Sequence, residues 1–409
     1  MIQVFQDPDL HPPTLACRPI PILLYADDVV LLSRTPIGIR RILKKLALYC
    51  EKEHLEINYQ KTKVMAFGKQ PRSRIWKLNG HKIEQVTKFK YLGVYIQASG
   101  AKSIHYSYTS DLGQRSANNI LKFYRTKGRF FIPAALKLYS AKSLAQLTYG
   151  AFLGAPLSDI IKLERVQSKF LRALLQLPCC VTNSMVRLET GMLMVQDKIC
   201  LSAIVMWLKL THNSQDIAPL ILKDNFQSSW TKAVKNEIQS LGFSTHFLSK
   251  LAHDQAASLV KQRIQDTRCQ LDLSKTPTFL APVKTRYVLA PATYLSQLVI
   301  NKQRRAFTLA RCSVLPSALV EGRYKNIPLS LRQCYCGSGQ IETREHILFH
   351  CPAYADIRGN LIEPLIKKFL AHQDVERANR LLCDETPQVT IQLAKFCAAA
   401  IKIRCSKVI

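Results

Sequence analysis

The amino-acid sequence predicts an α+β fold in which a small β-rich part comes first and a longer helical part follows. Short apolar runs separated by turn residues fill about the first 100 positions, which is typical of strands. From about residue 110 the apolar residues recur at helical spacing. Three cysteines and a histidine then fall close together between residues 334 and 351, a pattern that indicates a small metal-binding module.

Composition describes a globular and strongly basic protein. With 47% hydrophobic and 21% charged residues, the 409-residue chain can form two or three ordinary domains. Its net charge is +30, and the excess is uneven: residues 1–32 have a net charge of −3, whereas residues 33–149 carry 23 basic and 5 acidic side chains. Such a field favours RNA or DNA as a partner, with a merely soluble basic protein as the alternative.

Membrane insertion and secretion are not expected. No apolar run approaches the roughly 20 residues of a spanning helix. The first residues contain aspartates and prolines in place of the apolar core of a signal peptide. We therefore expect an intracellular protein, nuclear or cytoplasmic, whose 13 cysteines are mostly reduced thiols.

Two apolar, β-prone runs, Ile22–Tyr25 and Val29–Leu32, flank a tight acidic turn and predict a hairpin. The turn presents Asp27 and Asp28 at a strand end. Phosphoryl transfer by two metals needs carboxylates that hold Mg²⁺ ions roughly 4 Å apart. The alternative is a surface turn, where aspartate is common for conformational reasons alone.

The second candidate site is the cysteine–histidine cluster. Zn²⁺ prefers four nitrogen and sulfur ligands in a tetrahedron, with a tight pair and a later pair joined by folding. The candidate ligands are Cys334, Cys336, His346 and Cys351. His350 competes for the fourth position, and a loop of ordinary thiols is the alternative. Four ligands would close the metal shell, so the predicted role is structural or nucleic-acid-binding.

The third candidate is the basic stretch from Arg115 to Lys142, which has seven basic residues, no acidic residue and several interleaved aromatics. Basic side chains contact phosphates, and aromatics can stack on bases or pack in a core. We expect the cations to bind and most of the aromatics to pack. The expected phosphate-binding residues are Arg115, Lys122, Arg125, Lys127 and Arg129, with a smaller cluster at Arg304, Arg305 and Arg311.

Several of these segments resemble a known family in the order in which they occur. Leu24–Leu32 resembles palm motif C of reverse transcriptases. Leu55–Asn58 and Lys61–Met65 resemble motif D of the LINE-type (non-LTR) retrotransposon enzymes, and Tyr91–Val94 resembles the primer-grip region.

The later segments continue the resemblance. Tyr149–Gly150 and Val186–Gly191 resemble the thumb and post-thumb segments, and the cysteine–histidine cluster resembles the CCHC zinc knuckle that follows the thumb. The resemblance implies that Asp27 is a Mg²⁺ ligand and Asp28 its less directly coordinated neighbour. Lys61 would donate a proton to pyrophosphate, with a solvated surface lysine as the alternative.

The chain departs from the family before the hairpin. The family's palm needs a further aspartate on motif A, many tens of residues upstream, but only 24 residues precede Tyr25. Asp7 and Asp9 lie in a proline-rich stretch. We therefore expect fingers and motifs A and B to be absent. The expected domains are a partial palm with a primer-grip-like segment (1–98), a helical thumb and post-thumb (99–210), a helical connector (211–325) and a zinc-knuckle-like region with terminal helices (326–409).

The resemblance implies RNA-directed DNA polymerisation as the parent activity. For this chain we expect a retrotransposon-derived fragment that binds RNA or DNA and does not polymerise alone. Two alternatives stay open. The chain is an active polymerase on dNTPs if another polypeptide, or a longer reading frame, supplies the missing parts. It is otherwise a zinc-knuckle interaction protein with an inert palm.

Overall fold

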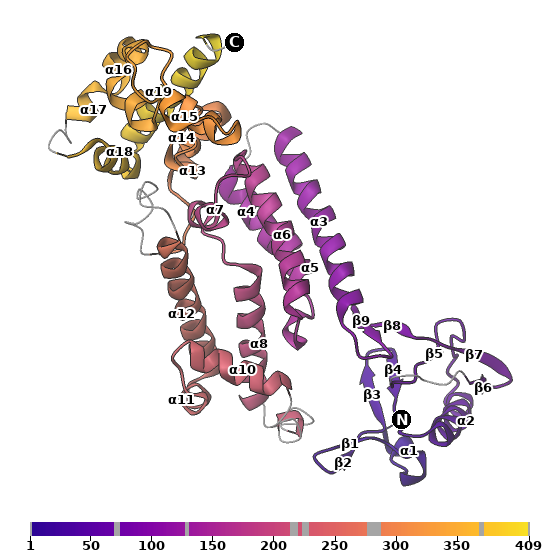
Figure 1. Cartoon of the computed structure of the whole chain (residues 1–409). Coiled ribbons are helices and arrows are strands. Elements are labelled where there is room, and N and C mark those ends of the chain that lie inside the picture. Colours follow the sequence, from indigo (N-terminus) through magenta and orange to yellow (C-terminus); the bar gives the residue numbers. More distant parts are fainter. Residues whose placement is uncertain are drawn as a thin grey trace. The chain divides into compact units, whose positions relative to one another are not determined.

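The computed structural model of the chain describes residues 2–68, 74–126, 131–212, 220–222, 229–275, 288–367 and 372–407. The chain divides into two compact, discontinuous units. The first comprises Met1–Tyr108, Tyr149–Asp159 and Cys200–Ser258, and the second comprises Thr109–Thr148, Ile160–Ile199 and Leu259–Ile409. Small sheets lie in the N-terminal part and helices dominate the rest, which agrees with the predicted α+β class (Figure 1).

The N-terminal part consists of short strands around one long helix. Its elements are α1 (Ile2–Phe5), β1 (Thr14–Leu15), β2 (Arg18–Pro19), β3 (Ile22–Tyr25), β4 (Asp28–Leu31), α2 (Pro36–Lys52), β5 (Lys63–Val64), β6 (Trp76–Leu78), β7 (His81–Gln85), β8 (Lys88–Tyr91) and β9 (Val94–Gln97). The strands form four small sheets, β1–β2, β3–β4, β5–β7–β6 and β8–β9. The predicted hairpin is confirmed as β3–β4, with Tyr25 opposite Asp28.

Helix α2 organises this part because it serves two apolar clusters. Its N-terminus is capped by Thr35, whose Oγ1 accepts a hydrogen bond from the Gly38 N–H at 3.0 Å. Leu43 and Ala47 pack against Trp76 and the strands beside it. Ile42 packs instead against the segment that includes β3. Burial of both faces fixes the hairpin and the β5–β7–β6 sheet to the same helix.

The segment Tyr91–Ile96, which the sequence indicates as one β-like piece, is divided by a turn. Leu92 and Gly93 both have positive φ, 46° and 82°, and Tyr91 pairs with Val94 across the turn. Two central residues with positive φ are typical of a two-residue hairpin, for which glycine is well suited. The result is the β8–β9 hairpin.

The mainly helical part of the chain begins at Ser103, slightly earlier than the sequence indicates. Its helices are α3 (Ser103–Thr126), α4 (Ile132–Leu138), α5 (Ala145–Thr148), α6 (Leu157–Leu175), α7 (Asn183–Thr190), α8 (Val195–His212), α10 (Ser229–Ser240), α11 (Thr245–Lys250), α12 (His253–Ser274), α13 (Tyr294–Gln297), α14 (Asn301–Arg311), α15 (Ala318–Tyr324), α16 (Ala355–Leu361), α17 (Glu363–Lys367), α18 (Asp374–Cys383) and α19 (Pro387–Lys407).

Buried ion pairs join the helices of the second unit. Arg187 on α7 donates from Nε to Asp272 Oδ2 on α12 at 2.8 Å, and both side chains are almost fully buried. Arg311 on α14 donates to Glu189 Oε1 on α7 at 3.1 Å. Such pairs stabilise a fold only when both partners are present, because a lone buried charge is costly. Near the chain's end, α19 packs along α14.

In the described part of the chain, no single helix combines the length and the apolar composition needed to cross a bilayer. Among these same residues, one bent pair of helices, α7 with α8, reaches both criteria when the two are counted together.

Candidate metal centre and nucleic-acid interface

The acidic turn of the β3–β4 hairpin faces solvent. Asp27 lies in the turn and Asp28 begins β4, and both are exposed. Ala26 takes a positive φ of 52°, which allows the tight reversal. In the described residues β3 and β4 pair only with each other, so the hairpin has two free strand edges.

Apolar side chains on this hairpin are also uncovered. Leu24, Tyr25 and Val29 are 44%, 62% and 38% exposed. Unpaired strand edges with apolar side chains normally pair with or pack against something else. The hairpin therefore has the properties of a surface that a further protein segment covers.

No third metal ligand accompanies the two aspartates among the residues that the structure describes. The upstream aspartates bind cations on α2: Asp7 Oδ2 accepts from Lys45 Nζ at 2.7 Å, and the Asp9 carboxylate lies 3.8 Å from Arg41. Lys61 lies in an exposed turn after α2. Within the described chain these residues do not assemble a two-metal site.

The cysteine–histidine cluster does come together. A bridge between Gln333 and Ile341 closes a loop that holds the first two cysteines, and the Cys334 N–H donates to the Gln340 carbonyl at 2.8 Å. Gly337 and Gly339, both with positive φ, make the reversal. The second pair of candidate ligands flanks a short π-helical turn, His346–His350.

The four side chains lie close enough together to hold one metal ion. One ligand atom from each lies within 4.8 Å of all the others, and the set is Cys334, Cys336, His346 and Cys351. Cys334 Sγ and Cys351 Sγ are 3.6 Å apart, and Cys336 Sγ lies 3.5 Å from His346 Nε2. Tetrahedral zinc with Zn–S near 2.3 Å and Zn–N near 2.0 Å requires separations of about 3.5–3.8 Å. The residues fit such an ion.

The two candidate histidines differ in their hydrogen bonds. His346 Nδ1 lies 2.7 Å from Gln340 Oε1, an acceptor only, so Nδ1 carries the proton and Nε2 is left with its lone pair toward the thiols. His350 Nε2 instead contacts Asp374 Oδ2 at 2.6 Å, on a half-exposed surface, and His350 is not in the group. The metal group therefore contains His346.

Electrostatics in the group depend mainly on burial. Burial raises the pKa of the Cys334 and Cys351 thiols. It acts in the same direction on Cys336, but hydrogen bonds with Ser338 and the neighbouring thiols outweigh it and lower the Cys336 pKa. Burial also lowers the pKa of His346, which favours the neutral imidazole that binds metals.

Two residues that the sequence did not indicate support this group. Gln340 orients His346, as described above. Arg358 is buried on α16 and donates from Nη2 to the Cys351 carbonyl at 2.6 Å and from Nε to the Leu348 carbonyl at 3.0 Å. Three thiolates with Zn²⁺ carry a net charge of −1, so a buried cation beside them is favourable. The position of Gln340 between the two pairs of candidate ligands could have indicated its role from the sequence. Nothing in the sequence indicated the role of Arg358.

On α3 the cations form an exposed strip. Arg115, Lys122 and Arg125 are exposed, whereas Tyr124 on the same helix is buried. Spacings of seven and three residues put the three cations on one side of a helix, over about 15 Å. Lys127 and Arg129 lie outside the described residues.

The smaller arginine cluster needs a correction. Arg305 is exposed, but Arg304 and Arg311 are buried at 6% and 4% exposure. Arg304 donates to the Leu298 carbonyl at 2.9 Å and to Tyr124, and Arg311 binds Glu189. A phosphate role does not fit guanidinium groups that are inside the fold and bound to protein atoms. Arg304 and Arg311 are therefore not part of a phosphate-binding surface.

One family model matches the N-terminal part of the chain. Residues 1–96 match the family model described as reverse transcriptase (RNA-dependent DNA polymerase). The match includes the β3–β4 hairpin with its two aspartates and ends within β9. No curated protein matches the chain. The comparison thus supports a reverse-transcriptase relationship for this segment.

Proposed function

We propose that this chain is a nucleic-acid-binding protein derived from a LINE-type retrotransposon reverse transcriptase, and that it does not extend a primer by itself. The observation that carries the proposal is the family match over residues 1–96, which contains the acidic hairpin. The net charge of +30 supports a polyanionic partner.

The proposed binding surface is the cationic strip on α3, defined as Arg115, Lys122 and Arg125. These side chains are exposed. A helix that presents cations on one side can follow a sugar-phosphate backbone without reading its sequence. We therefore assign residues 99–210 to a thumb-like element, after a partial palm at 1–98 and before a helical connector at 211–325.

The proposed lack of polymerisation rests on the geometry of the candidate metal ligands. Two adjacent carboxylates on one turn cannot supply the opposed ligands that two Mg²⁺ ions need. In the described residues Asp27 and Asp28 have no third ligand beside them. When bound, Mg²⁺ would stabilise the charge that develops on the transferred phosphoryl group.

The alternative is an active RNA-directed DNA polymerase assembled with another polypeptide segment. The uncovered apolar side chains of the β3–β4 hairpin favour it, because a further strand beside β3 would cover them. In such an assembly Asp27 and Asp28 would bind Mg²⁺, and Lys61 would serve as proton donor to pyrophosphate.

At the C-terminal end we propose a structural zinc knuckle within residues 326–409. Four protein ligands would close the coordination shell, which leaves no open position for catalysis. A knuckle can add phosphate or base contacts to those of α3. If it were the main binding element, the chain would act as an interaction protein, and the α3 strip would contribute little.

A salt titration tests the proposal. Binding to an RNA–DNA duplex should weaken log-linearly with salt, by about 0.9 in slope for each phosphate contacted. Replacing Arg115, Lys122 and Arg125 by Gln should flatten the slope by up to about 2–3 units. The matched control changes the same charge at three exposed lysines elsewhere, Lys250, Lys261 and Lys395.

Equal loss of slope in the two triple variants would show that net charge alone matters and would reject the α3 surface. Equal binding of the unchanged chain to anionic vesicles at matched salt would reject nucleic acid as the preferred partner. A circular dichroism spectrum first establishes that both variants fold.

A further inference from the structure

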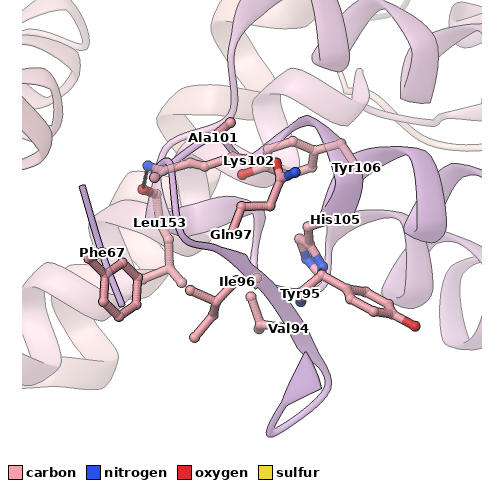
Figure 2. A pocket seen from close by; sticks show the side chains of 12 residues that line it. Phe67, Val94, Tyr95, Ile96, Gln97, Ala101, Lys102, His105, Tyr106 and Leu153 are labelled. Carbon is pink, nitrogen blue, oxygen red and sulfur yellow. Dashed lines mark hydrogen bonds between the residues drawn. The ribbon is translucent and has the colours of Figure 1, made fainter. Parts of the chain in front are cut away.

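Two adjacent exposed cysteines in the second unit, Cys179 and Cys180, have no part in the functions proposed above. Their accessibility contrasts with the apolar recess of the first unit, between β9 and the first turn of α3 (Figure 2). There the lysine and the histidine are bound to the fold. Lys102 Nζ donates to the Leu153 carbonyl at 2.6 Å, and His105 is buried with both ring nitrogens in hydrogen bonds.

The fold presents the two thiols at the apex of a tight turn between α6 and α7. The turn is Pro178–Val181, in which the Val181 N–H donates to the Pro178 carbonyl at 3.4 Å, so the cysteines are its two central residues. On either side of them, Leu177 and Val181 are buried at 8% and 4% exposure. Free cysteine is among the most buried residue types. Packing therefore does not explain two neighbouring thiols that are exposed between buried anchors.

Arg172 on α6 holds this turn from both ends. Its Nη1 donates to the Pro178 carbonyl at 3.1 Å, and its Nη2 donates at 2.7 Å to Asn183 Oδ1, at the start of α7. Thr182 caps the same helix, because its Oγ1 accepts a hydrogen bond from the Met185 N–H at 3.3 Å. A turn that is fixed in this way holds the thiols in place before a ligand arrives, which lowers the entropic cost of binding.

Both sulfurs lie near the same two side chains. Hydrogen bonding with Cys180 raises the pKa of Tyr324, the last residue of α15, to about 12, and Cys179 acts in the same direction. Burial lowers the pKa of Arg172, and both thiols oppose that effect. Two thiols that interact with the same phenol and the same guanidinium lie on one side of the turn, where one ion can contact both.

We infer that Cys179 and Cys180 together bind a thiophilic ion of low coordination number, of the class of monovalent copper and trivalent arsenic. Thiolate ligands select soft ions. Among the described residues, no third cysteine, histidine or carboxylate joins the pair at the distance of a metal ligand. Structural zinc needs four ligands, so the pair fits an ion that two sulfurs can satisfy.

Phenylarsine oxide is a suitable probe because its binding needs no oxidant. Two As–S bonds form as the As–O bonds break, the two thiol protons leave with the oxygen as one water molecule, and arsenic stays trivalent. The inference depends neither on nucleic-acid binding nor on the proposed zinc knuckle, whose cysteines lie elsewhere in the chain.

The test maps this probe on the full chain, reduced with a phosphine and loaded with Zn²⁺. Mass spectrometry of proteolytic fragments should find one equivalent on the fragment that contains both cysteines. Cys179→Ser and Cys180→Ser should each raise the Kd by about 100-fold or more, because the second sulfur binds intramolecularly. The matched controls are Cys17→Ser and Cys405→Ser, at single exposed thiols, and should leave the Kd unchanged.

An unchanged Kd in either variant of the pair, in a chain with native circular dichroism, would show attachment to one sulfur and overturn the inference. A probe found mainly on other fragments would also overturn it. A second arm supplies monovalent copper as its bicinchoninate complex without oxygen. The unchanged chain should take up one equivalent more than the double variant Cys179→Ser/Cys180→Ser, and equal uptake would reject copper as a ligand of the pair.

Discussion

Replacing His346 by alanine should remove zinc from the cysteine–histidine group, whereas replacing His350 should not. Structural zinc binds with about 10–16 kcal/mol in small peptides. Shared among four ligands, the loss of one is about 2.5–4 kcal/mol, or roughly 70- to 900-fold in Kd. His350 contacts Asp374 on a half-exposed surface, so His350→Ala should change zinc affinity by less than about 5-fold.

A third variant tests the hydrogen bond that orients the ligand. Gln340 Oε1 accepts from His346 Nδ1 at 2.7 Å, and loss of such a partner weakens metal affinity by about 10- to 100-fold. Gln340→Leu should therefore fall between the two histidine variants. Zinc competition against a chromophoric chelator measures all three. The Co²⁺-substituted chain reports the ligand set through the charge-transfer bands of its thiolates.

The refuting results are specific. If His346→Ala still bound zinc and His350→Ala did not, the His350 ring would have to turn away from Asp374 to become the ligand. Zinc below about half an equivalent on the unchanged, folded chain would reject the four-ligand site altogether.

Three further predictions concern activity and stability. The purified chain should extend no primer on an RNA template with Mg²⁺ or Mn²⁺; extension that disappears in Asp27→Ala would contradict this. Asp272→Ala should lower the free energy of unfolding by about 3–5 kcal/mol in urea titrations, because Arg187 is left buried and unpaired, and adding Arg187→Met should recover part of the loss. Gly38→Ala should lower the free energy of unfolding by about 1–3 kcal/mol, because a Cβ there would overlap neighbouring atoms. Gly359 is also in a helix but faces open space, so Gly359→Ala should raise the free energy of unfolding by about 0.5–1 kcal/mol. The opposite order would show that packing at Gly38 is loose.

Local patterns were predicted well and long-range partners were not. The β3–β4 hairpin follows from two adjacent apolar runs and a turn, so sequence neighbours alone specify it. The four candidate metal ligands were predicted from their spacing, but the choice between His346 and His350 depends on Gln340 and Asp374, which are placed by folding. A pattern of residue types cannot show which of two nearby rings faces inward.

The arginines of α14 show a second limit. Basic residues close together indicate a phosphate surface only if they are exposed. Arg304 and Arg311 are seven residues apart and share a helix face with the buried Phe307, whereas Arg305 lies about 100° away and is exposed. Helical periodicity alone could therefore have indicated that Arg304 and Arg311 are buried. One partner of each arginine, Tyr124 for Arg304 and Glu189 for Arg311, is more than a hundred residues away along the chain.

The discontinuous first unit has a consequence for synthesis on the ribosome. Its last segment ends at Ser258, about 150 residues after its first segment ends at Tyr108. At about 5–20 residues per second, the first segment waits roughly 8–30 s for its completing partners. During that interval the groups that later bind Tyr149, the His105 ring and the Leu92 carbonyl, are accessible to chaperones and to other nascent chains. The order of translation therefore determines how long the first segment exists without the rest of its unit.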